Sequence, residues 1–149
     1  MTNTSTPNTF IHQFVGSWEL KQWVVERSDG QTAFPFGEDA QGRIAYDAFG
    51  NMSVQIMQHN RPPFSSDDPL EGQPEEVLEA YQSFIAYCGS YEVIADSNQV
   101  VHHIEISSFP NWAGQEQRRY YAFTGDTLTL STDFIGSRRH QLIWEKITY

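Results

Sequence analysis

A histidine stands on an apolar face of a strand-like segment in the second half of the chain. Residues 99–107 read Gln-Val-Val-His-His-Ile-Glu-Ile-Ser, and the side chains of a strand alternate between its two faces. Val100, His102, Ile104 and Ile106 therefore share one face, which we expect to point into the core. Because histidine titrates near neutral pH, His102 could bind a ligand or transfer a proton. The alternative is a structural histidine that is bonded to a neighbouring group.

The other face of the same segment carries His103 and Glu105, which we expect to face solvent. A shift of one residue in the strand register would exchange the two faces. It would turn His103 and Glu105 inward as a histidine–carboxylate pair. The register therefore decides which of the two histidines faces the core.

An arginine has a similar position in the segment 116–124. Arg119 shares a face with Gln117, Tyr121 and Phe123, so its guanidinium could lie inside the fold. A partly buried guanidinium needs an acceptor, either a ligand carboxylate or enolate or an internal Asp or Glu. The sequence thus predicts His102, Arg119 and Tyr121 as candidate catalytic residues.

Further polar and aromatic side chains are predicted to bind a ligand. The loop from Phe109 to Gly114 would place Asn111 and Trp112 at a rim, where Trp112 is either a corner plug or a stacking wall. The predicted ligand-binding residues are Tyr46, Gln55, Tyr81, Tyr91, Asn111 and Trp112. No metal site is predicted, because His102 and His103 point to opposite faces and the other histidines have no ligand spacing.

Short strand patterns separated by turn residues run through most of the chain. The predicted strands are residues 17–27, 42–47, 52–58, 90–95, 99–107, 116–124, 127–133 and 139–147. One helix is predicted from Pro74 to Ile85, where apolar residues recur at helical spacing, and we expect it to cover a barrel opening. The loop 60–73 before it is long enough to form a lid or portal.

These elements predict an all-β fold with one short helix. About eight antiparallel strands indicate an eight-stranded up-and-down β-barrel, and a barrel of that size can hold one small ligand in an internal pocket. With 149 residues, we expect a single domain over residues 10–149, after a disordered N-terminal tail at residues 1–9.

The composition excludes several classes of protein. The formal net charge is −10, which argues against binding to nucleic acid or to an anionic membrane surface. The single cysteine, Cys88, excludes an intramolecular disulfide and is expected to be a small, unreactive residue. The N-terminus lacks the apolar core of a signal peptide, so a cytoplasmic location is expected.

Several motifs fall in an order that resembles the lipocalin-like domain family. They are Gly16-Ser17-Trp18, Gly42-x-x-x-Tyr46, Gly50 to Gln55, Tyr87 to Val93, Pro110-Asn111-Trp112-x-Gly114 and Leu142-x-Trp144-Glu145. The resemblance covers nearly the whole chain after residue 10. It implies a small intracellular calycin-type barrel in which the first Trp closes one barrel end. It also implies a late basic residue stacked on that Trp, for which Arg138, Arg139 and Lys146 are the candidates.

Three functions remain open at this point. The first is a protein that binds a small hydrophobic, anionic or enolic molecule inside the barrel. The second is a cofactor-independent cyclase, isomerase, dehydratase or other lyase of specialised metabolism that acts on such a molecule. The third is an interaction domain whose core is filled. No cofactor is expected, and the protein is expected to be a monomer or a homodimer; a cavity with a few buried polar groups would favour the first two functions.

Overall fold

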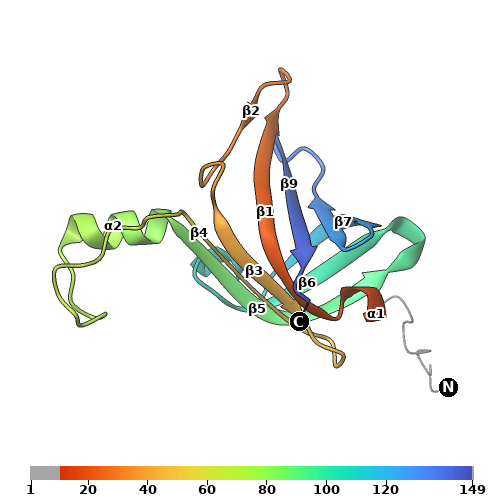
Figure 1. Cartoon of the computed structure of the whole chain (residues 1–149), viewed down its shortest axis with the longest axis horizontal. Helices are drawn as coiled ribbons and strands as arrows, with labels where there is room; N and C mark the ends of the chain where they lie inside the picture. Colours follow the sequence, from red (N-terminus) through yellow and green to blue (C-terminus); the bar gives the residue numbers. More distant parts are fainter. Residues whose placement is uncertain (1–10, 149) are drawn as a thin grey trace.

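The computed structural model of the chain describes residues 11–148, and its strands form one antiparallel sheet that closes on itself (Figure 1). The sheet order is β2-β1-β3-β4-β5-β6-β7-β8-β9, and β1 also pairs with β9. The strands are β1 Gly16–Arg27, β2 Thr32–Ala33, β3 Gln41–Tyr46, β4 Asn51–Met57, β5 Phe84–Ile94, β6 Gln99–Ser107, β7 Glu116–Thr124, β8 Thr127–Ser131 and β9 Arg138–Lys146. The short β2 adds to the edge of β1, so eight strands make the closed antiparallel barrel, as predicted. The expected tail, residues 1–9, lies outside the described residues.

The core lies inside the barrel because each strand alternates apolar and polar side chains. In β4, for example, Met52, Val54 and Ile56 are buried, whereas Asn51 and Gln55 are exposed. In β6, Val100, His102 and Ile104 are buried, and so is Val101. Ile106, which was expected on the inner face, is 70% exposed, because it lies beyond a register shift between β5 and β6. The register of β6 therefore places His102 inside and His103 outside.

Two bulges change which side chains face inward. In β1 the register shifts between Leu20 and Gln22, so Trp18 and Leu20 face inward on one side of the bulge and Trp23 on the other. The second shift lies between Cys88 and Gly89, opposite β6. A side chain at Gly89 would overlap the His103 carbonyl oxygen, so this position requires glycine.

An aromatic cluster fills one end of the barrel, where the helix α1 (Ile11–Phe14) lies beside the strands (Figure 1). Phe14 is fully buried and makes edge contacts with Tyr46, Tyr121 and Phe123 at centroid distances of 4.9–5.2 Å. We call this cluster, completed by Trp18 and Tyr91, the aromatic floor.

Trp18 anchors the floor to both ends of the chain. Its Nε1 donates to the Phe14 carbonyl oxygen at 2.9 Å, and Lys146 Nζ lies 5.4 Å from the centre of its ring. Lys146 is thus the basic residue on the first-strand Trp, whereas Arg139 lies over the Phe134 ring.

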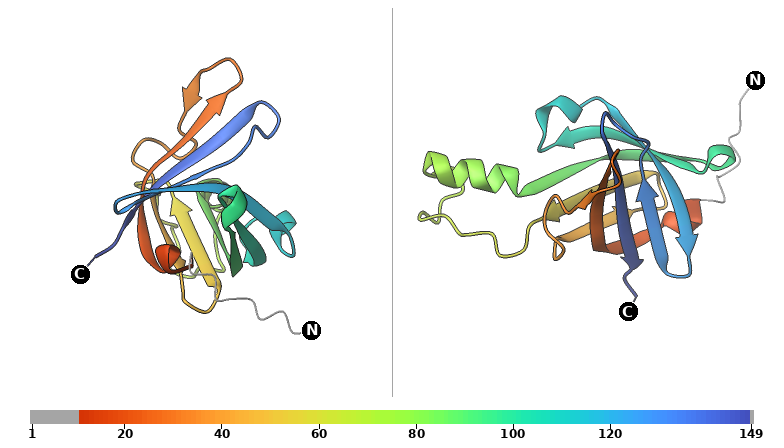
Figure 2. Two further views of the ribbon diagram at one scale, coloured as in Figure 1. Left: turned by 90° about the vertical axis from the view of Figure 1, so that its right-hand side faces the viewer. Right: turned by 90° about the horizontal axis from the view of Figure 1, so that it is seen from above.

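The predicted position of the helix is wrong. The helix α2 (Pro74–Gln82) has no buried residue, and it extends away from the barrel and does not cover an opening (Figures 1 and 2). It also ends before Phe84 and Ile85, which start β5 by pairing with Met57 and Ile56 of β4. Pairing in the sheet half-buries these two apolar residues, whereas α2 buries none, so β5 is longer than expected.

Contacts within the segment 59–83 hold this arm together. Arg61 donates to Ser83 Oγ and to the Ala80 carbonyl, each at 3.0 Å, and its guanidinium lies over the Phe84 ring. Glu76 accepts hydrogen bonds from the backbone amides of Gln73 and Ser65. In the stretch 11–148, no helix is long and apolar enough to cross a membrane.

Candidate functional site

A cavity of about 160 Å³ lies inside the barrel beside the aromatic floor. Most of its wall is apolar, and the aliphatic part consists of Ile44, Val54, Ile56, Ile85, Leu130, Ile135 and Leu142. The wall also holds side chains that can form hydrogen bonds: Trp23, Tyr87, His102, Trp112, Gln117, Arg119, His140 and Trp144. A mainly apolar cavity with a few converging polar groups is the usual form of a small-molecule site.

His102 bonds to two tyrosines at once. Its Nε2 lies 2.7 Å from Tyr46 Oη, and its Nδ1 lies 2.7 Å from Tyr87 Oη. The three side chains come from β6, β3 and β5. Strand alternation points all three side chains inward. In β5, Tyr87 and Tyr91 face inward on either side of Gly89, which has no side chain. We call this trio the Tyr46–His102–Tyr87 chain.

Burial keeps all three members of this chain neutral. Loss of solvent lowers the pKa of His102 to about 3, and the positive charge of Arg119 acts in the same direction. Burial also raises the pKa of Tyr46 and of Tyr87 above the ordinary value of 10.0. At neutral pH the trio therefore consists of one neutral imidazole and two protonated phenols.

Arg119 is the one cationic side chain of the cavity wall, and it lacks a carboxylate partner within the described chain. Its Nη1 donates to the Arg118 carbonyl at 2.9 Å, and its Nη2 donates to Gln117 Oε1 at 3.2 Å. None of the ion pairs among residues 11–148 includes it. The internal salt bridge considered from the sequence is not formed there, and guanidinium N–H groups remain for another acceptor.

Two tryptophans differ in how their indole N–H groups are used. Trp23 Nε1 donates to His140 Nδ1 at 3.1 Å, and burial lowers the pKa of His140. Trp144 is 1% exposed, and its Nε1 has no hydrogen-bond partner among the described residues. A buried donor without a partner is rare in folded proteins, so Trp144 is a second indication of a ligand.

The structure places the predicted site residues in three groups. His102, Arg119 and Trp112 line the cavity, and Tyr46 reaches it through His102. Tyr91 and Tyr121 belong to the aromatic floor, and Tyr91 Oη donates to the Asp47 carbonyl. The structure does not bring the remaining three to the cavity: Gln55 lies on the outer face, Asn111 is exposed, and Tyr81 lies on α2.

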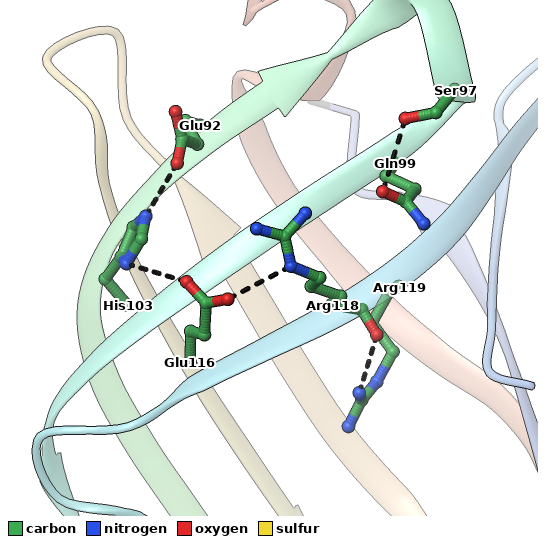
Figure 3. Close-up of polar contacts among 7 residues, drawn as sticks. All are labelled: Glu92, Ser97, Gln99, His103, Glu116, Arg118 and Arg119. Carbon is green, nitrogen blue, oxygen red and sulfur yellow. Dashed lines mark hydrogen bonds and ion pairs between the residues drawn. The ribbon is translucent and has the colours of Figure 1, made fainter.

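His103 lies on the outer face, between two carboxylates. His103 Nε2 is 2.9 Å from Glu92 Oε1, and Nδ1 is 3.7 Å from Glu116 Oε2 (Figure 3). Arg118 joins the same surface network through Glu116, while Arg119 points in the opposite direction from β7. His103 and Glu105 therefore do not form an internal pair.

Sequence reasoning missed Tyr87, His140 and Trp144 as cavity residues. Tyr87 was missed because the helix was expected to run to Ile85, which left no strand around position 87. His140 and Trp144 share the inner face of β9 with Leu142, so alternation along that strand could have found them. In the described part of the chain, no group of three His, Cys, Asp or Glu residues could hold a metal ion.

The site is suited to binding more than to proton transfer by His102. His102 can exchange a proton with a bound molecule only through Tyr87, because both of its ring nitrogens have hydrogen-bond partners. Its pKa of about 3 also makes it a weak base. Trp112 packs edge-on against Tyr87 at 5.8 Å and forms part of the wall. The groups left free are hydrogen-bond donors.

Several known proteins are similar to this chain. A redesigned β-barrel aligns with 93% of this chain and 95% of its own at 10% identity and a TM-score of 0.45. A mutant of the fluorescent protein UnaG aligns with 93% of this chain and 99% of its own at 11% identity and a TM-score of 0.43. Similarity at this level carries no argument about a ligand.

Two comparisons of sequence go further. The 4'-hydroxy-3'-methoxypropiophenone carrier protein ppsC of Aspergillus oryzae is 36% identical over 87 residues, which are 54% of this chain and 78% of that protein. The sequence pattern of the lipocalin-like domain matches residues 15–147, which is nearly the whole described chain. With its closed eight-stranded barrel and this match, the chain belongs to the lipocalin-like domain family.

Proposed function

We propose that the protein binds and carries a small hydrophobic molecule that has an anionic, enolic or other oxygen acceptor group. The observation that carries this proposal is the apolar cavity whose wall contains Arg119 without a carboxylate partner among residues 11–148. Apolar walls stabilise a hydrophobic body through burial, and a guanidinium in such a wall favours an oxygen acceptor.

The carrier relative supports the same function. The compound for which that protein is named, 4'-hydroxy-3'-methoxypropiophenone, is an aromatic ketone with a phenol group and therefore combines an apolar ring with oxygen acceptors. A ligand of this kind matches the chemistry of the cavity wall.

The experiment is a titration of the protein with 4'-hydroxy-3'-methoxypropiophenone. Binding is measured by calorimetry and by the change in fluorescence of the cavity tryptophans. The bound compound is then extracted, and its molecular mass is measured by mass spectrometry. We expect saturable binding at one site and recovery of the compound unchanged. Absence of binding to this compound and to simple aryl ketones would overturn the proposal, and recovery of a rearranged or dehydrated product would indicate an enzyme instead.

A matched pair of variants tests whether binding takes place in the barrel. Arg118 and Arg119 are neighbours on β7, but Arg118 pairs with Glu116 on the outer surface. We expect Arg119→Ala to weaken binding and Arg118→Ala to leave it unchanged. Equal effects of the two substitutions would contradict binding inside the barrel.

A further inference from the structure

The Tyr46–His102–Tyr87 chain contains a fixed number of protons. A neutral imidazole has one N–H and one lone pair, and each protonated phenol has one O–H. His102 can therefore accept a hydrogen bond from only one tyrosine and must donate to the other. The tyrosine that receives the imidazole proton keeps its own O–H free to donate elsewhere.

The surroundings of the two tyrosines decide which of them keeps a free proton. Tyr46 is 2% exposed and does not line the cavity, and its neighbours Phe14 and Tyr91 present aromatic rings. Among the described residues, its hydroxyl forms a hydrogen bond to His102 and to no other side chain or backbone group. A free O–H on Tyr46 would be a buried donor without a partner, which is costly.

Tyr87 has the opposite surroundings, because it lines the cavity. The favoured arrangement is therefore that Tyr46 Oη donates to His102 Nε2, and His102 Nδ1 donates to Tyr87 Oη. The hydroxyl proton of Tyr87 then remains available on the cavity side. This arrangement requires the Nδ1–H form of His102.

Other polar groups of the cavity wall also leave donors free and acceptors in use. The indole N–H of Trp23 can only donate, so His140 Nδ1 must accept, and neutral His140 has its proton on Nε2. Gln117 Oε1 accepts from Arg119. The unpartnered Trp144 Nε1 adds another donor. The cavity thus offers free donors, whereas each of these side-chain acceptors already accepts one hydrogen bond.

We infer that the cavity selects its ligand by an oxygen acceptor, a carbonyl or an oxyanion conjugated to an apolar body, and that the Tyr87 hydroxyl donates to this oxygen in a direction fixed by Tyr46 and His102. This inference rests on the proposed carrier function and names the class of molecule carried. A ligand of the same shape that offers only donors, or no polar atom, should bind more weakly.

The direction of the hydrogen bonds in the Tyr46–His102–Tyr87 chain can be measured without a ligand. Nitrogen-15 NMR of the full-length protein, labelled at histidine, distinguishes a protonated ring nitrogen from an unprotonated one. We expect His102 to have its proton on Nδ1 and a lone pair on Nε2, with neither changing between pH 8 and pH 5. A proton on Nε2 would overturn the inference, whether or not any molecule binds.

The selectivity is tested with two probes of the same shape. Acetophenone and α-methylstyrene differ only in that an oxygen replaces a methylene group. We expect wild-type protein to bind acetophenone more tightly and Tyr87→Phe to weaken acetophenone binding roughly 2- to 12-fold, the range for one neutral hydrogen bond. The affinity for α-methylstyrene should not change, which also shows that the cavity of the variant is intact.

Tyr120→Phe is the control, since the Tyr120 hydroxyl donates to Asp133 on the outer face. It should alter the affinity for neither probe. Equal affinity of wild-type protein for the two probes would overturn the selection by an acceptor but leave the carrier function standing. Failure of both probes to bind would contradict the carrier function itself.

Discussion

The two ends of the barrel interior use the same residue types for different purposes. The aromatic floor and the cavity wall both contain tyrosine and tryptophan, and both are largely buried. In the floor, the buried Trp18 and Tyr91 have protein partners: Trp18 donates to the Phe14 carbonyl and Tyr91 to the Asp47 carbonyl. In the wall, Trp144 has no partner within the described chain.

This difference separates core packing from recognition. Burial alone does not distinguish Trp18 from Trp144, since each is 1% exposed. Their hydrogen bonds distinguish them, because a polar atom that is already bonded within the protein is not available to a ligand. Substitutions in the floor should therefore change stability, whereas substitutions in the wall should change binding.

The largest effect on stability is expected from Phe14→Ala. Phe14 is fully buried between the rings of the floor, so its truncation should lower the free energy of unfolding by about 3–5 kcal/mol. Urea denaturation measures this change. Phe49→Ala is the control, because Phe49 is 91% exposed and should change stability by no more than about 0.5 kcal/mol. A similar loss for both variants would show that the floor is not the core of the fold.

The next prediction concerns the pH dependence of stability. The pKa of His102 is about 3 in the folded protein against an ordinary 6.5, so the unfolded chain binds the proton more readily. Its contribution is fully present above pH 6.5 and is lost as the pH falls towards 3. The free energy of unfolding should decrease by up to about 1.4 kcal/mol per pH unit in this window.

The substitution His102→Gln isolates the contribution of His102 to the pH dependence of stability. Glutamine can both donate and accept, and it does not titrate, so the difference between wild type and variant should narrow as the pH falls from 6.5 to 4. His140, whose pKa is also lowered, titrates in both proteins and cancels in the comparison. A difference that does not vary with pH would show that His102 is not held neutral.

The barrel was predictable from the sequence because alternation and turn residues repeat along the chain. The same alternation correctly predicted that His102 and Arg119 face inward. The pairing around both residues is regular, because the bulge between β5 and β6 lies beyond Ile104 and the pairing of β6 with β7 has no bulge. The bulge in β1 was not predictable, and it is what turns Trp23 inward. A bulge depends on pairing with a distant strand, which no local pattern reveals.

The helix boundary shows a second limit. Phe84 and Ile85 continue the apolar spacing of a helix, but they also pair with Met57 and Ile56 of β4. The gain from pairing within the sheet is a tertiary effect and outweighs local propensity. This one boundary hid Tyr87, which is the central donor of the cavity.

In binding, the largest effect is expected from Arg119→Ala with an anionic probe. A hydrogen bond to a charged group contributes about 1.5–3 kcal/mol, so the affinity for benzoate should fall by roughly 10- to 150-fold. Calorimetry in the same buffer measures both proteins. Arg118→Ala, on the outer face, should bind benzoate like the wild type. Loss of benzoate binding in both variants would instead indicate a general effect of surface charge.

The smallest effect compares one substitution at two tryptophans. Trp18→Phe removes a donor that the Phe14 carbonyl uses, so it loses packing and also leaves a buried acceptor unpaired. Trp144→Phe loses packing as well, but it removes a buried N–H that has no partner among the described residues. Relief of that unpaired donor offsets the lost packing, so Trp144→Phe should stay within about 1 kcal/mol of wild type in unfolding experiments. Trp18→Phe should be clearly the less stable of the two. If Trp144→Phe were instead as destabilising as Trp18→Phe, its indole N–H would have a partner in the protein, and the cavity would have one donor fewer to offer a ligand.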